Sequence, residues 1–244
     1  MTAGSPTTTI DTVVVAERLS TVRDRIAAAG GSTDDIVVVA VTKGFGPDAV
    51  AAAGAAGLTD VGENYAQELA GKWEASGGVI GGRHWHFLGR VQRNKVRAIA
   101  PAVELWQGVD REGAGREIAR RAPGAGVLVQ VRISDDHDGS GSGAGGGGEA
   151  RNGCAAAEVP ALVEALEGLG LQVRGLMAVG PKGPPELARC GFREVSALAE
   201  RLGLAVRSMG MSADLEVAVE EGSTMVRVGR ALFGPRPLGP RTRR

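Results

Sequence analysis

The sequence predicts an α/β protein built as a single (β/α)8 barrel of the TIM type, with an extra helix at its N-terminus. Segments rich in β-branched residues alternate with segments of helical periodicity along most of the chain, and eight of them resemble strands. A length of 244 residues suits one such barrel. The competing fold is an open doubly wound sheet. It is disfavoured because no GxGxxG fingerprint follows the first strand, which runs instead into TKGFG.

The first element is a helix over residues 11–29, where Val14, Leu19, Val22 and Ile26 recur at helical spacing. The apolar run at 36–42 then predicts a strand that is buried on both faces, as in a parallel sheet. The alternation continues from there to the end of the barrel. The remaining strands are expected at 58–62, 84–89, 103–108, 126–133, 172–179, 204–209 and 224–229, and the helices between them at 47–56, 64–76, 92–100, 111–122, 158–169, 185–202 and 212–220.

A glycine-rich insertion interrupts this alternation. The segment GSGSGAGGGGE is of low complexity, and we expect a disordered loop at 137–150. The insertion could instead link two domains. We favour a loop after the fifth strand, because strands and helices resume with the same character beyond it. The barrel is therefore expected over 11–236, with flexible ends at 1–10 and 237–244.

The composition excludes several classes of protein. Lysine and arginine number 28, as do aspartate and glutamate, so the chain lacks the broad basic field of a nucleic-acid binder. We expect no membrane partner, because no apolar stretch is as long as a membrane span. The first residues do not resemble a secretory signal. Cys154 and Cys190 lack the spacing of zinc ligands, and two reduced thiols are typical of a cytoplasmic protein.

Amines and phenols are scarce in this chain, which limits where their chemistry can occur. Its four lysines are Lys43, Lys72, Lys95 and Lys182, and its one tyrosine is Tyr65. Lys43 ends the first predicted strand, so it is either a surface lysine at the mouth of the barrel or a partly desolvated amine facing the axis. Desolvation would lower its pKa and free an amine that can attack a carbonyl. For the other three lysines we expect surface positions.

Polar residues gather where the predicted strands end, and this is the face at which barrels of this type carry their sites. Ser212 lies at the start of a helix with acidic residues in its first turn, so it is a candidate N-cap. Together with Gly229, after the eighth strand, it could also form a phosphate cradle. Arg227 interrupts an apolar strand, and we expect it to meet a ligand or a carboxylate. His86 is either a structural histidine or a ring contact for a ligand.

Four segments in order, GENY, HFLGRVQRNK, SMGMSAD and VRVGRALFG, resemble the pyridoxal phosphate homeostasis proteins, also known as the proline synthetase co-transcribed family. The resemblance runs from the first helix to Arg236. It implies a fold like the N-terminal barrel of alanine racemase. It also implies that pyridoxal 5'-phosphate (PLP) is held as an internal aldimine. The implied role is PLP homeostasis and delivery, with no or negligible catalysis.

Position by position, the resemblance assigns the aldimine to Lys43. The residues that it places around the cofactor are Ser212, Gly229 and Arg230 at the phosphate, Arg227 at the pyridine nitrogen, and Asn64 and Met209 along the ring. An arginine beside that nitrogen disfavours its protonation, which weakens the cofactor as an electron sink. The family usually has a lysine after the fifth strand. Here the counterpart is Arg151, which cannot form an imine.

Two other functions share parts of this pattern. One is a PLP-dependent racemase or decarboxylase acting on amino acids. Racemisation would need a second acid–base group opposite the lysine, and a single tyrosine argues against that arrangement. A Schiff-base, aldolase-like barrel would share the lysine and the cradle, but the segments GENY and SMGMS disfavour it. We therefore predict a non-catalytic, monomeric, cytoplasmic PLP-binding protein with apo PLP-dependent enzymes as candidate recipients.

Overall fold

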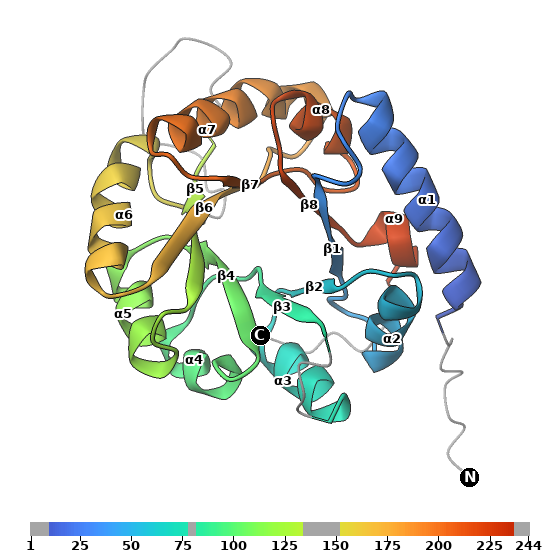
Figure 1. Ribbon diagram of the computed structural model, residues 1–244, viewed down its shortest axis with the longest axis horizontal. Coiled ribbons are helices and arrows are strands. Elements are labelled where there is room, and N and C mark those ends of the chain that lie inside the picture. Colours follow the sequence, from blue (N-terminus) through green and yellow to red (C-terminus); the bar gives the residue numbers. More distant parts are fainter. Residues whose placement is uncertain (1–9, 78–81, 134–151, 237–244) are drawn as a thin grey trace.

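A computed structural model describes residues 10–77, 82–133 and 152–236 of the chain. Eight parallel strands close into a barrel in the order β1 to β8, and helices surround it (Figure 1). The predicted (β/α)8 fold with its extra N-terminal helix α1 is thus confirmed. The strands are β1 (Val37–Val41), β2 (Asp60–Glu63), β3 (His84–Phe87), β4 (Val103–Val109), β5 (Gly126–Val131), β6 (Gln172–Ala178), β7 (Val206–Ser208) and β8 (Met225–Val228).

The helices follow the predicted alternation, with one addition. Helix α9 was not predicted, because a four-residue helix shows no periodicity. Two short 3-10 turns, η1 (Ala156–Glu158) and η2 (Pro185–Ala188), precede α6 and α7. The α-helices are α1 (Thr12–Ala28), α2 (Pro47–Ala55), α3 (Ala66–Ala75), α4 (Arg93–Ile99), α5 (Glu112–Arg121), α6 (Val159–Gly168), α7 (Arg189–Arg201), α8 (Leu215–Glu220) and α9 (Arg230–Phe233).

The glycine-rich insertion lies between two strands that pair with each other. Strands β5 and β6 are hydrogen-bonded in parallel, from Gly126 with Gln172 to Val131 with Ala178. The chain on both sides of the insertion therefore belongs to one barrel. The loop predicted at 137–150 lies outside the described residues, as do the predicted flexible ends apart from Ile10.

The apolar core has two parts, because side chains of a strand alternate between its two faces. The larger part fills the space between barrel and helices, where α1 buries Val15 together with three of the four predicted residues, Leu19, Val22 and Ile26. The smaller part lies inside the barrel and consists of Val39, Leu105, Leu128, Met177 and Met225. Several polar side chains share the barrel interior with this small cluster, among them His86, Gln107 and Arg227.

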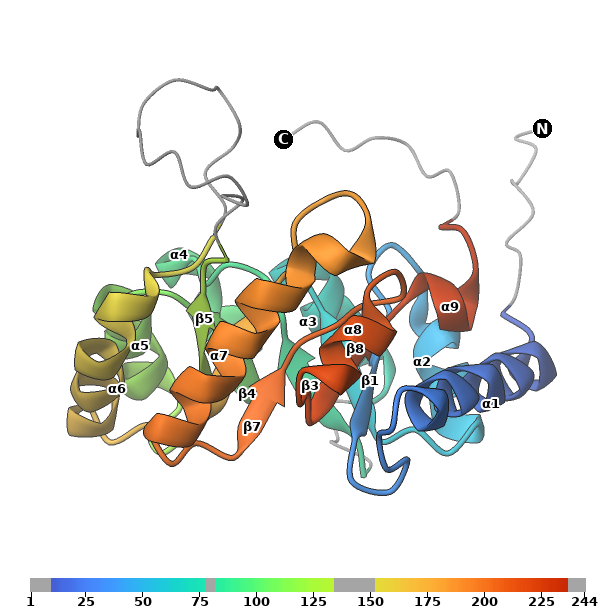
Figure 2. The same ribbon diagram turned by 90° about the horizontal axis from the view of Figure 1, so that it is seen from above.

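The strands deliver their C-terminal residues to one end of the barrel. Seen edge-on, the connection from β6 to α7 and helix α9 lie at this same end (Figure 2). Helix α1 packs outside the barrel beside α9 (Figure 1), and Arg18 of α1 donates a hydrogen bond of 3.2 Å to the carbonyl oxygen of Leu232 in α9. Among the described helices, none is long and apolar enough to cross a membrane.

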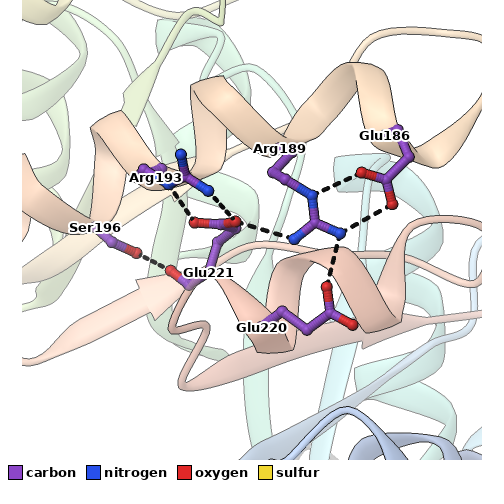
Figure 3. A network of polar contacts seen from close by, with 6 residues as sticks. All are labelled: Glu186, Arg189, Arg193, Ser196, Glu220 and Glu221. Atoms are coloured by element: carbon purple, nitrogen blue, oxygen red, sulfur yellow. Dashed lines mark hydrogen bonds and ion pairs between the residues drawn. The ribbon is translucent and has the colours of Figure 1, made fainter.

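An ionic network ties α7 to the end of α8 on the outer surface (Figure 3). The Arg189 guanidinium contacts Glu186 at 2.6 Å, Glu220 at 2.7 Å and Glu221 at 3.0 Å. Arg193, one turn further along α7, contacts Glu221 at 2.9 Å. These hydrogen bonds, that from Glu186 first, raise the pKa of Arg189. The network therefore holds two neighbouring helices together on the outer surface of the barrel.

Candidate functional site

A cavity of about 270 Å³ opens at the C-terminal end of the barrel. Strands β1 and β8 and the loops after β2, β6, β7 and β8 all contribute to it. Of the residues predicted for the site, six line this cavity: Lys43, Asn64, Ser212, Arg227, Gly229 and Arg230. The other described lining residues are Val41, Phe45, Leu88, Met177, Val179, Met211, Ala213 and Arg236.

The charged side chains around the cavity all carry the same sign. Lys43, Arg227, Arg230 and Arg236 line it, and none of the described lining residues is an aspartate or glutamate. Apolar side chains make up most of the rest of the wall. A cavity with cations at some points and apolar walls between them suits a small anionic molecule with a flat or apolar body.

Lys43 takes the second of its two predicted positions, as a half-buried amine that lines the cavity. Its ammonium group makes no hydrogen bond or ion pair with any residue that the structure describes. Burial lowers the pKa of Lys43, and the positive charges of Arg236 and Arg227 lower it further. Glu63 and Glu68 oppose this shift without reversing it. The amine is thus more available as a neutral nucleophile than an ordinary lysine.

Helix α3 holds the backbone on both sides of Lys43. Lys72 Nζ donates a hydrogen bond of 2.7 Å to the carbonyl oxygen of Thr42, the residue before it. Glu68 Oε2 accepts a hydrogen bond of 2.7 Å from the backbone N–H of Gly44, the residue after it. Gly44 has a φ of 76°, which glycine adopts without strain. The lysine therefore projects from a fixed stretch of backbone.

The prediction of a surface position was wrong for Lys72. Its side chain is 5% exposed and forms an ion pair with Glu63, which is fully buried. Thr42 Oγ1 donates a further hydrogen bond of 2.8 Å to the same carboxylate. Burial raises the pKa of Glu63, and the Lys72 ammonium opposes that rise. Lys72 lies one helical turn after Leu69, which is also buried, so the two face the barrel together.

Ser212 lines the cavity but does not cap the helix that follows it. Helix α8 begins at Leu215, and its N-cap Asp214 accepts a hydrogen bond from the backbone N–H of Met211 at 2.6 Å. The Ser212 hydroxyl instead accepts a hydrogen bond of 3.2 Å from the N–H of Ala231, in the first turn of α9. Ser212 thereby connects the loop after β7 to the loop after β8, which are the two loops predicted to form the phosphate cradle.

Met209, predicted to line the ring of a cofactor, lies elsewhere. Its side chain is fully buried in the core between barrel and helices and is not among the lining residues. Met211 lines the cavity instead. Gly210 between them has a φ of 88°, and a Cβ there would lie 2.6 Å from the Cβ of Ala218. This backbone turn, which the sequence pattern does not show, exchanges the roles of the two methionines.

Arg227 lines the cavity and does not meet the carboxylate that was one of its two predicted partners. Its side chain is buried, and its N–H groups donate to the carbonyl oxygen of Ala178 at 2.7 Å, to the Ser208 hydroxyl at 2.7 Å and to the Ser208 carbonyl oxygen. No carboxylate in the described ranges forms an ion pair with it. Burial lowers the pKa of Arg227 to about 10, although the charge of Asp214 opposes this. The positive charge therefore remains unneutralised beside the cavity.

Comparison with known proteins identifies the family. The alanine racemase N-terminal domain family matches residues 10–237. The pyridoxal phosphate homeostasis protein of Pseudomonas aeruginosa is 37% identical over 234 residues, which cover 92% of this chain and 95% of that protein. The protein of the same name from Escherichia coli K12 is 35% identical over 242 residues, covering 91% and 97%. This chain belongs to the pyridoxal phosphate homeostasis protein family.

Solved structures agree with this placement. PipY of Synechococcus elongatus, without PLP, superposes with a TM-score of 0.75 at 28% identity and covers 90% of this chain and 100% of its own. The same protein with PLP bound gives a TM-score of 0.72 at 27% identity. Alanine racemase from Corynebacterium glutamicum has a TM-score of 0.67 at 17% identity, covering 94% of this chain and 63% of its own, and shares the fold. The resemblance to the homeostasis family is confirmed.

His86 lies apart from the cavity of this homeostasis-family barrel. Its side chain is 3% exposed, with Nε2 at 2.9 Å from Asp60 Oδ1 and Nδ1 at 2.7 Å from Gln107 Nε2. The structure therefore favours the structural interpretation of His86 over a ring contact. The predicted counterpart of the family lysine, Arg151, lies outside the described residues.

Sequence reasoning missed several residues of the site. Arg236 lies two residues after the VRVGRALFG segment, so the segment could have pointed to it as a site residue. No such signal points to Met211. Phe45 and Met177 form part of the apolar wall. Gln107 was also missed, because nothing in the LWQGV segment shows that this side chain is buried beside His86.

Proposed function

We propose that this protein binds PLP in the cavity through Lys43 and acts in PLP homeostasis and delivery without turning over a substrate. One observation carries the proposal. The Lys43 amine, unpaired within the described residues, borders a cavity whose charged side chains there are all cationic. The names of the relatives from P. aeruginosa and E. coli, and PipY with PLP bound, support the identity of the ligand.

The residues present fit the three functional groups of this cofactor. When bound, PLP supplies an aldehyde that condenses with a primary amine and releases water. Lys43 offers that amine, and its lowered pKa favours the neutral form that attacks. Ser212, Gly229 and Arg230 meet at the start of α9 and are the proposed phosphate ligands. Asn64 and the apolar wall would contact the ring.

Arg227 would face the ring nitrogen and restrain reactivity. A guanidinium donates hydrogen bonds and accepts none, and it has no proton to give up near neutral pH even with the lowered pKa of Arg227. It can therefore bind the nitrogen without protonating it. An unprotonated pyridine withdraws electrons weakly, and this favours storage over turnover.

The cavity also offers few groups for catalysis. Its described lining residues include no histidine, tyrosine, cysteine, aspartate or glutamate, so Lys43 has no acid–base partner among them. Tyr65 is 55% exposed and lines a neighbouring hollow rather than this cavity. These positions weigh against the racemase, decarboxylase and aldolase alternatives, all of which must move protons on a bound substrate.

Absorbance and mass spectrometry test the ligand and its lysine. Wild-type protein with PLP is expected to show the visible absorbance of a protein-bound imine, and Lys43→Ala is expected to lose it. Borohydride reduction followed by peptide mass spectrometry should place the label on Lys43 among four lysines. Lys182→Ala, at an exposed position, is the matched control and should keep the band. A band that persists in Lys43→Ala would overturn the assignment.

An alanine racemisation assay tests the absence of turnover. We expect no exchange of the α-proton above the rate of free PLP, and multiple turnover by the wild type would contradict the non-catalytic role. A monomeric state, a cytoplasmic location and apo PLP-dependent enzymes as recipients remain predictions. Size-exclusion chromatography and transfer of PLP to an apo-enzyme, with and without reduction of Lys43, would test the first and the last.

A further inference from the structure

A line of hydrogen-bonded side chains runs through the barrel from one end to the other. Asp60 begins β2 and contacts His86 at 2.9 Å, and His86 contacts Gln107 of β4 at 2.7 Å. Ser208, the last residue of β7, contacts Gln107 at 2.7 Å and Arg227 at 2.7 Å. Because β4 and β7 are not neighbours in the barrel, the contact between Gln107 and Ser208 crosses its interior.

The chemistry of the two ends gives this line a single direction. Arg227 can only donate, so the Ser208 oxygen accepts from it and the Ser208 hydrogen points to Gln107 Oε1. The amide nitrogen of Gln107 then donates to His86 Nδ1, which must be unprotonated. The remaining ring proton lies on Nε2 and is donated to the acceptor-only carboxylate of Asp60.

His86, Gln107 and Ser208 each have a hydrogen-bond partner on both sides along the line. The Gln107 amide also donates to Met225 Sδ at 3.2 Å, so both of its hydrogens are in use. A second proton on His86 would set an N–H against the Gln107 amide hydrogens. Turning that amide over would in turn leave the Ser208 hydrogen without its acceptor. His86, Gln107 and Ser208 are all buried, so no bulk water can replace a lost partner.

We propose that Asp60, His86, Gln107 and Ser208 are positioning residues for Arg227, and that they hold its guanidinium beside the cavity with His86 as the neutral Nε2–H tautomer. The cavity is not lined by Asp60, His86 or Gln107. Their effect on a ligand is therefore exerted through the arginine. As far as it concerns PLP, this inference rests on the function proposed above.

Nitrogen NMR of the ligand-free protein tests the direction of the line. Long-range proton–nitrogen spectra at neutral pH distinguish the two neutral tautomers from the imidazolium. The chain has three histidines, so the signal that is missing from the spectrum of His86→Gln identifies His86 in the spectrum of the wild type. We expect the Nε2–H form. An Nδ1–H form or an imidazolium would overturn the proposal.

A double-mutant cycle tests whether the line acts through Arg227. Gln107→Leu is expected to weaken PLP binding about fivefold, the effect of losing one buried hydrogen-bonded link. In an Arg227→Met background, the same substitution should change the affinity no further. The matched control is Gln130→Leu, which replaces a buried glutamine of β5 that bonds to Asn152 outside this line and should leave binding unchanged.

The outcomes separate this proposal from the proposed function. Equal weakening in both backgrounds would mean that Gln107 supports the fold and not the arginine, and would overturn the positioning role. If the wild type failed to bind PLP, the proposed function would fail. The NMR measurement would still test the line of hydrogen bonds. His86 is expected to lose its single tautomer in Gln107→Leu and to keep it in Gln130→Leu.

Discussion

Two arginines of this barrel are held in opposite ways. Arg189 lies partly exposed on the outer surface with three carboxylates around it, and their hydrogen bonds raise its pKa (Figure 3). Arg227 is buried in the barrel, bonded to carbonyl and hydroxyl oxygens, and burial lowers its pKa to about 10. The first charge is neutralised where water already screens it. The second, among the residues that the structure describes, has no ion-pair partner, and it lies where water is excluded.

The difference indicates what each arginine is for. Carboxylates around an exposed arginine fasten two helices, and each such pair contributes little to stability because solvent screens it. Neutral acceptors around a buried arginine orient it without cancelling its charge. A charge that is fixed in direction and still unsatisfied can attract a ligand group, which is what the cavity at the strand ends requires.

The largest effect on stability is expected from the other buried cation, Lys72. Lys72→Met leaves the Glu63 carboxylate buried without its partner, and we expect the free energy of unfolding to fall by about 3 kcal/mol. Urea denaturation measures this, with the exposed Lys182→Met as a control that should change little. If the two variants proved equally stable, a buried cation would contribute no more to stability than an exposed one, which would contradict the comparison.

The largest effect on PLP affinity is expected from Arg227→Met. The variant keeps an unbranched apolar side chain but removes the guanidinium, so PLP affinity should fall by about tenfold to a hundredfold, as when a hydrogen bond to a charged group is lost. Titration by absorbance measures the affinity. Arg189→Gln serves as the control and should bind as the wild type does. Unchanged affinity in Arg227→Met would remove the proposed role of the buried charge.

A pH dependence is expected at the far end of the line, at Asp60. Burial alone would raise its pKa, but hydrogen bonds from His86 and Thr59 outweigh burial and lower it below the ordinary value of 3.8. A carboxyl whose pKa is lowered on folding stabilises the fold above its ordinary pKa and loses that contribution as the pH falls through the lowered value. Asp60→Asn should therefore be less stable than the wild type at about pH 7, and the gap should narrow below about pH 3. Urea unfolding at both values measures it, and a gap that stayed constant would contradict the assignment.

The smallest effect is expected from Arg189→Gln. The substitution removes the contacts to Glu186, Glu220 and Glu221 from an exposed site, so the melting temperature should fall slightly and the difference should shrink in high salt. Calorimetry at low and high ionic strength measures both. A large loss that salt left unchanged would show that the network does more than join α7 to α8.

Much of the architecture could be predicted from the chain alone, because its signals are local. Strands such as β1 and β5 are mostly apolar runs, and the longer helices have their own periodicity. The barrel and the position of Lys43 just after β1 therefore follow from neighbouring residues. Ser212, Arg227 and Gly229 could be placed at the site for the same reason, since each lies where a strand ends.

What could not be predicted depends on turns of the backbone and on distant partners. The positive φ at Gly210 puts Met211 in the cavity and Met209 in the core. Ser212 caps a helix nineteen positions further on, at Ala231, and not the helix that follows it. Lys72 finds Glu63 only when α3 folds back over β2, and Gln107 meets Ser208 only across the closed barrel.

The two bonds from α3 to the peptide groups beside Lys43 bear on how a cofactor store would work. With Thr42 and Gly44 already held, the backbone has little conformational entropy left to lose when the amine is engaged, and little to regain when it is freed. Binding and release of the cofactor then change the side chains and the solvent, while the backbone conformation stays the same. The barrel could therefore bind and release the cofactor many times without a change of fold. Substitutions around the cavity could adjust its affinity for PLP without lowering the stability of the barrel.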